Sequence, residues 1–197
     1  LREGNSDRRA PKAVKNYAKK HPHSMGAWSA DSKTHVASMS EGDFYGSEKS
    51  VTIKDADTFK IEFVGTDGTT KLLKDTSPLK AGEIIDSAVL SVNALKKFIA
   101  KEIEDAKAKG VLFSVHLKAT MMKVSDPIIF GAIVDVFFAP VFEKYATLFA
   151  ELGVNTKNGF GDVYAKIAGH PQQAEVESAI NDVYANAPAL AMVNSDK

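Results

Sequence analysis

The sequence predicts an α/β protein, with a partly parallel sheet whose βαβ unit is flanked by helices and with a small antiparallel β-meander. Residues 83–115 supply the first observation, because a strand pattern, an amphipathic helix pattern and an apolar strand pattern follow one another. Residues 50–76 supply the second, with short strand-like segments separated by turn residues. The long apolar stretch after Pro127 supplies the third, because Ser125 and Pro127 mark the start of a helix there.

Residues 1–49 are expected to hold a polar loop, a short helix and an irregular segment. Pro11 suits the start of a helix, which should end near Lys20. His21, His23 and His35 lie in the irregular part. A metal site made from these histidines is conceivable, but their spacing is not that of a zinc site and the chain has no cysteine. We therefore favour surface or hydrogen-bonding roles for them.

Residues 50–80 are expected to form antiparallel strands. The segments 50–55, 58–65 and 69–76 are each short, and turn residues separate them. Asp67-Gly68 between the last two segments is a strong hairpin signal. Because the exposed face of this meander is simply charged, it is expected to be a structural flap or a subunit contact rather than a site.

Residues 81–197 are expected to form the α/β core. Residues 83–90 form a strand pattern, Ser91 is placed to cap the helix 92–109, and Gly110 is placed to end it. The segment 111–115 then has the apolar character of a buried strand. A crossover of this kind is right-handed and joins parallel strands, so residues 83–90 and 111–115 should run parallel in one sheet.

The last part of the chain is expected to be mainly helical. Ser125 and Pro127 mark a helix start, and Pro140 should kink or split the apolar helix that runs to about Gly153. Gly159-Phe160-Gly161 lacks the preceding strand and third glycine of a dinucleotide loop, so we interpret it as a turn. A helix from Pro171 to Asn186 and a strand at 189–194 complete the prediction.

Composition excludes several classes of function. The chain has 197 residues, with 44% hydrophobic and 25% charged residues, as in ordinary globular proteins. A formal net charge of zero gives no reason to expect nucleic acid or an anionic membrane as a partner. The absence of cysteine rules out disulfides and fits a cytoplasmic location. Both ends of the sequence look cut, so we expect the chain to be a fragment of one larger domain.

The residues alone point to a site for a small anion around Lys118. This lysine and His116 follow the predicted strand 111–115, and ligands of open α/β sheets collect where strands end. The lysine fits a structural ion pair as well as catalysis, and a hydrogen-bonded core role is favoured for His116. The loop of residues 1–11, with Arg2 and Arg8, fits a solvated tail or a loop that binds carboxylates through arginine forks.

Long runs of the sequence resemble one protein family. The runs are LREGNSDRRAPKAVKNYAKKHPHSMGAWSADSKTHVA, GDFYGSEKS, LFSVHLKATMMKVSDPIIFG and LAMVNSDK. They are similar to the monomeric type of NADP-dependent isocitrate dehydrogenase. The similarity spans the whole chain and corresponds to a minor, interior part of the family's much longer chain.

The resemblance implies oxidative decarboxylation of isocitrate to 2-oxoglutarate and carbon dioxide, with NADP as hydride acceptor and Mg²⁺ or Mn²⁺ as the ion. Arg2 in LREG and Arg8 in SDRR match the family's isocitrate-binding arginines. Lys118 in VHLKAT matches its catalytic lysine, which also contacts the substrate. The family's metal-binding aspartates, partner tyrosine and cofactor-binding segments have no match here. The fragment is therefore expected to carry part of the substrate site, no metal or cofactor site, and no activity alone.

Two alternatives stay open. The chain fits a standalone module that binds a small carboxylate or phosphate through Arg2, Arg8 and Lys118 without redox chemistry. It also fits a purely structural piece that self-associates through apolar surface.

Overall fold

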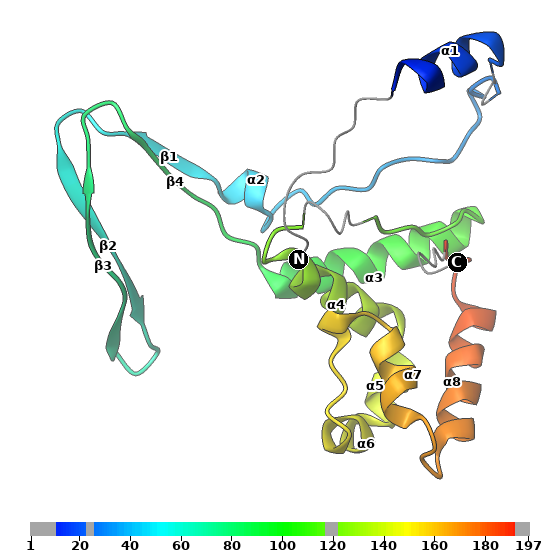
Figure 1. Ribbon diagram of the computed structural model, residues 1–197. Helices are drawn as coiled ribbons and strands as arrows, with labels where there is room; N and C mark the ends of the chain where they lie inside the picture. The colour runs from blue at the N-terminus through cyan, green and yellow to red at the C-terminus, as the bar shows by residue number, and fades with distance from the viewer. Residues whose placement is uncertain (1–10, 23–25, 117–121, 192–197) are drawn as a thin grey trace. The chain divides into compact units, whose positions relative to one another are not determined.

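The computed structural model describes residues 11–22, 26–116 and 122–191. The chain divides into two compact units, one formed by Met39–Ala94 and the other by Leu1–Ser38 together with Leu95–Lys197. Figure 1 traces the helices and strands of both units. Each unit is described by itself below.

The unit Met39–Ala94 is a two-stranded antiparallel arm with a short helix, α2 (Phe44–Ser47), before it. Strand β1 (Lys49–Thr52) pairs with β4 (Ile84–Ser87), and β2 (Asp57–Val64) pairs with β3 (Thr70–Leu79), all antiparallel. At the tip, the amide of Gly65 donates to the carbonyl of Thr69 over 2.8 Å, and Gly68 has φ +81°. The predicted hairpin at Asp67-Gly68 is therefore confirmed, because the turn needs a residue that tolerates positive φ.

The predicted parallel pairing of residues 83–90 with 111–115 is wrong for the described chain. Strand β4 pairs antiparallel with β1, and the amide of Ile53 donates to the carbonyl of Glu83 over 2.8 Å. Among the described residues, 111–115 belong to no named strand, and the ladder contact found there is a parallel bridge between Phe113 and Leu190. The hairpin of β2 and β3 already brings the chain segments on either side of it together, so β1 and β4 continue the same antiparallel pair and no separate loop has to be closed. The α/β composition is correct, but the described strand pairs are antiparallel.

The other unit is helical. Its helices are α1 (Lys12–Lys20), most of α3 (Val92–Lys109), α4 (Asp126–Phe137), α5 (Ala139–Lys144), α6 (Ala146–Glu151), α7 (Gly161–Ile167) and α8 (Gln173–Asn186), with a 3-10 helix at Thr156–Asn158. The predictions of α1, α3 and α8 are confirmed in position. Pro140 does divide the long apolar helix, because α5 begins at Ala139 with this proline in its first turn. A second break follows at Tyr145.

The core of this unit lies among α4 to α8. Val163, Ile167, Val176 and Ile180 are each 0% exposed, and Val141 is 1% exposed. The ring of Phe138 stacks on Phe160 with centroids 3.8 Å apart and meets Tyr184 edge-on at 5.4 Å. Burial of one such side chain stabilises the fold by about 1.5–3 kcal/mol. These apolar positions, spaced at three and four residues, explain why the sequence folds into helices here.

The three predicted caps of helices α3 and α4 had different outcomes. The hydroxyl of Ser91 accepts from the amide of Ala94 over 3.3 Å at the start of α3, and Gly110 has φ +65° at its end, so both predicted caps are confirmed. Ser125 makes no side-chain cap at the start of α4. The carboxylate of Asp126 instead accepts from the amide of Lys123 over 3.0 Å, which fixes the turn before the helix.

Candidate functional site

The three predicted site residues, Arg2, Arg8 and Lys118, lie outside the described residues. Their roles therefore stay predictions. The structure does describe the segments that lead toward Lys118 and away from it, residues 111–116 and 122–127.

Residues 111–116 alternate between half-buried and exposed side chains. Val111, Phe113 and Val115 are half-buried, whereas the residues between them and His116 are exposed. Phe113 holds this segment in place: its amide donates to the carbonyl of Ala189 over 2.8 Å, and its ring stacks on Phe137 with centroids 6.1 Å apart. The segment therefore has the side-chain alternation of a strand, although it makes one ladder contact within the described part of the chain.

His116 lies on the exposed side of this segment. Its imidazole Nε2 is hydrogen-bonded to the hydroxyl of Ser114, two residues earlier. The expectation of a hydrogen-bonded histidine is thus correct, but the expectation that it lies in the core is wrong. The cause is the alternation itself, because His116 shares the parity of Ser114 and not that of the half-buried Phe113.

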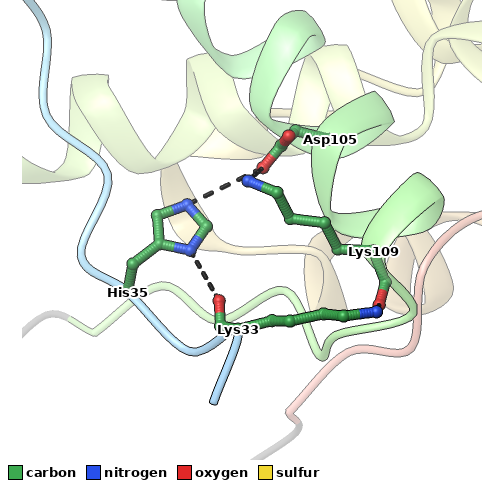
Figure 2. A network of polar contacts seen from close by, with 4 residues as sticks. All are labelled: Lys33, His35, Asp105 and Lys109. Atoms are coloured by element: carbon green, nitrogen blue, oxygen red, sulfur yellow. Dashed lines mark hydrogen bonds and ion pairs between the residues drawn. The ribbon is translucent and has the colours of Figure 1, made fainter. Parts of the chain in front are cut away.

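A second polar cluster joins the irregular residues before Ser38 to helix α3, and Figure 2 shows it. The Nζ atom of Lys33 donates to the carbonyl of Lys109 over 3.3 Å, near the end of α3. His35 Nδ1 contacts the carbonyl of Lys33 at 2.9 Å, and its Nε2 lies 3.7 Å from Asp105 Oδ2. Lys109 Nζ lies 2.7 Å from the same carboxylate oxygen.

The charges around Asp105 lower the pKa of its carboxyl group. The hydrogen bond from Lys109 is the largest cause, burial opposes it, and the charges of Lys109, His35 and Lys101 add to the lowering. Glu102, one helical turn earlier, contributes a further carboxylate to the cluster. Donor atoms of His35, Glu102 and Asp105 all lie within 4.8 Å of one another. The cluster therefore links residues 33–35 to helix α3 through polar contacts, and it also brings together potential metal donors.

This cluster does not fit the Mg²⁺ or Mn²⁺ ion that the resemblance implies for the isocitrate site. Mg²⁺ prefers oxygen donors in near-octahedral geometry, whereas this cluster offers an imidazole and has the ammonium group of Lys109 on one of its carboxylates. Among residues 11–22, 26–116 and 122–191, it is the one histidine–carboxylate group with metal-site geometry. We therefore assign no role in isocitrate chemistry to it.

Sequence reasoning missed the pairing of His35 with Asp105. The spacing of His21, His23 and His35 concerns histidines alone, and Asp105 lies far from them in the sequence. In the structure, the ring of His21 lies against Tyr17 instead, with centroids 4.3 Å apart. Only the i, i+3 spacing of Glu102 and Asp105 hinted at a shared face of α3, and that spacing is common on solvated helices.

Comparison with known proteins places the whole chain in one group. The family model described as monomeric isocitrate dehydrogenase matches residues 1–197. The chain is 60% identical to isocitrate dehydrogenase [NADP] of Azotobacter vinelandii over 199 residues, covering 100% of this chain and 27% of that protein. It is 59% identical to isocitrate dehydrogenase [NADP] 2 of Colwellia maris, again over 100% of this chain and 27% of the relative.

The same similarity extends to a more distant relative. Identity is 50% to isocitrate dehydrogenase [NADP] 2 of Mycobacterium tuberculosis, covering 99% of this chain and 26% of that protein. The chain thus spans about a quarter of the length of these curated relatives. In the part of the chain that the structure describes, no helix combines the length and apolar character needed to cross a membrane.

Proposed function

Since the chain belongs to the monomeric isocitrate dehydrogenase family, we propose that it forms part of the isocitrate site of an NADP-dependent isocitrate dehydrogenase. The observation that carries the proposal is the match of all 197 residues to the family model, together with 60% identity to a protein named isocitrate dehydrogenase [NADP]. The proposed reaction is oxidative decarboxylation of isocitrate to 2-oxoglutarate and carbon dioxide, and the proposed location is the cytoplasm.

Arg2 and Arg8 are proposed to bind carboxylates of isocitrate. A guanidinium group matches a carboxylate with two parallel hydrogen bonds, so two arginines fix both the charge and the orientation of a tricarboxylate. Orientation matters because hydride transfer requires the substrate carbon to be held close to its acceptor. The runs LREG and SDRR, which carry these residues, support the assignment.

Lys118 is proposed as the catalytic lysine. Its ε-amino group would move a proton at the substrate hydroxyl and would take part in protonating the enolate after carbon dioxide leaves. Bound NADP would supply the hydride acceptor. The run VHLKAT, which carries Lys118, supports the assignment.

Mg²⁺ or Mn²⁺ would supply Lewis-acid polarisation of the substrate, and residues outside this chain are proposed to hold it, as they are for NADP. The chain's own contribution is therefore binding and proton transfer. Because metal and NADP are held by residues outside this chain, the proposed activity belongs to a longer protein of which these residues form a part.

The arginine assignment is tested in the protein made from the complete reading frame. Arg2→Gln and Arg8→Gln are each expected to raise KM for isocitrate about ten- to a hundredfold, because a charge-assisted hydrogen bond contributes about 1.5–3 kcal/mol. Arg9→Gln, in the same loop, is the matched control and should leave KM within about twofold. An unchanged KM in both Arg2→Gln and Arg8→Gln would remove the arginines from the substrate site.

The alternative of a standalone binding module makes a different prediction. It would bind isocitrate or phosphate through the same three residues, but the complete protein would form no NADPH. Following NADPH absorbance with isocitrate and Mg²⁺ separates the two functions directly.

A further inference from the structure

We propose that His35, Glu102 and Asp105 form a binding site for a divalent transition-metal ion of the zinc class. The proposal is independent of the proposed isocitrate site. It rests on the tautomer of one imidazole, the spacing of three donors, and the position of one lysine, all in the cluster drawn in Figure 2.

The tautomer of His35 is fixed by the backbone. Its Nδ1 lies 2.9 Å from the carbonyl oxygen of Lys33. A carbonyl oxygen can only accept, so Nδ1 carries the proton and donates it. The neutral ring then presents the lone pair of Nε2 on its opposite side. Metal-binding histidines use this same arrangement, in which a backbone carbonyl orients the ring and leaves the other nitrogen free to coordinate.

The Nε2 atom of His35 faces a carboxylate at a distance that suits a shared ion. Nε2 and Asp105 Oδ2 are 3.7 Å apart, which is too long for a hydrogen bond. Two donors of one tetrahedral zinc ion, with bonds of about 2.0–2.2 Å, are separated by about 3.4 Å. A small shift of either side chain would therefore let both groups bind the same ion.

Glu102 supplies the third donor. It lies three residues before Asp105 on helix α3, so both carboxylates project from the same face. Its donor atom lies within 4.8 Å of those of His35 and Asp105. Imidazole with carboxylates suits Zn²⁺, Co²⁺ and Ni²⁺ better than Mg²⁺ or Ca²⁺, which prefer oxygen alone. Water would complete the coordination, because His35 is exposed.

Lys109 supplies the positive charge beside Asp105 in this structure. Its ammonium group lies 2.7 Å from Asp105 Oδ2 and therefore competes with an incoming ion for that oxygen. The ion must displace Lys109, whose side chain is 43% exposed and can turn toward solvent. The bound ion would then fasten residues 33–35 to α3, as the hydrogen bond from Lys33 to the carbonyl of Lys109 does without it.

The test uses the complete protein, freed of metal, in buffer that contains excess Mg²⁺ to saturate oxygen-donor sites. Isothermal titration with Zn²⁺ measures affinity, and the visible absorption of bound Co²⁺ reports the nitrogen ligand. His35→Gln and Asp105→Asn are each expected to weaken Zn²⁺ binding at least about tenfold. His21→Gln is the matched histidine control and should not change the affinity.

Lys109→Met provides a test that does not depend on loss of function. Removing the competing ammonium group is expected to tighten Zn²⁺ binding, whereas a merely damaged fold would weaken it. The proposal is overturned if His35→Gln and Asp105→Asn bind Zn²⁺ as the unaltered protein does. It is also overturned if Lys109→Met fails to tighten binding, because the ammonium group and the ion would then not share a site.

Discussion

Gly131 lies where helix α4 comes close to the 3-10 helix Thr156–Asn158. A Cβ atom built at this position would lie 3.1 Å from the amide nitrogen of Lys157 and 3.1 Å from the hydroxyl of Thr156. Helix α4 therefore packs against the 3-10 helix Thr156–Asn158 through a residue without a side chain. The sequence alone did not single out this glycine, because a close approach between distant segments leaves no local signal.

Gly131→Ala is expected to destabilise the fold by about 1–3 kcal/mol through overpacking, reduced by up to about 1 kcal/mol of helix propensity. Urea unfolding measures the change. Gly161→Ala is the matched control, because a Cβ at this helical position meets no atom within 4 Å. Equal stability of the two variants would show that α4 and the 3-10 helix do not pack closely.

Tyr164 and Tyr184 make stability depend on pH in alkali. Burial raises the pKa of both phenols above the ordinary 10.0, with the charge of Glu177 adding to the effect at Tyr164 and that of Tyr164 at Tyr184. A group whose folded pKa is raised stabilises fully below its unfolded pKa and loses that contribution as pH rises through the folded value. The free energy of unfolding should therefore fall above about pH 10.

The double change Tyr164→Phe with Tyr184→Phe is expected to flatten this alkaline loss, measured by urea unfolding between pH 8 and 11. Tyr17→Phe is the control, because Tyr17 is exposed on α1. A slope that stays as steep in the double variant as in the control would assign the loss to other groups.

At the scale of elements, Ser47 closes the base of the arm. Its hydroxyl donates to the carbonyl of Val89 over 2.6 Å and accepts from the amide of the same residue over 2.8 Å. One side chain thus satisfies both backbone groups of a residue that follows β4. Because each net hydrogen bond contributes about 0.5–1.5 kcal/mol, the contact holds the two ends of the arm together.

Ser47→Ala is expected to speed hydrogen exchange at the Val89 amide about tenfold, which corresponds to about 1.4 kcal/mol of local stability. Ser50→Ala, within β1, is the control and should leave this amide unchanged. Unchanged protection of Val89 in Ser47→Ala would show that the hydroxyl does not close the arm.

The elements themselves could be predicted where the signal is local. The start of α1 at Pro11, the division at Pro140 and the hairpin at Asp67-Gly68 each follow from one or two residues. The pairing of β4 could not be predicted, because strand periodicity says which face is buried but not which partner is adjacent. The same limit applies to the cluster of His35, Glu102 and Asp105, since nothing in the sequence around His35 predicts that Asp105 lies beside it.

At the scale of the whole molecule, the 197 residues are expected to form no NADPH from isocitrate on their own. The proposed site places the metal ligands and the NADP-binding segments elsewhere in the longer protein. The measurement is NADPH absorbance with the isolated chain, after circular dichroism has verified its helices, beside the complete protein at equal concentration. Turnover by the isolated chain would contradict the proposal that the metal ligands and the NADP-binding segments lie outside it.

The proposed role of Lys118 is proton transfer in isocitrate oxidation. It is tested most directly by comparing kcat of the complete protein with that of Lys118→Met, using Lys123→Met from the same stretch as the control. Loss of a general acid–base is expected to lower kcat about 10²- to 10⁴-fold, with Lys123→Met close to the unaltered protein. Nearly unimpaired turnover by Lys118→Met would contradict the account, and so would a complete protein that does not oxidise isocitrate.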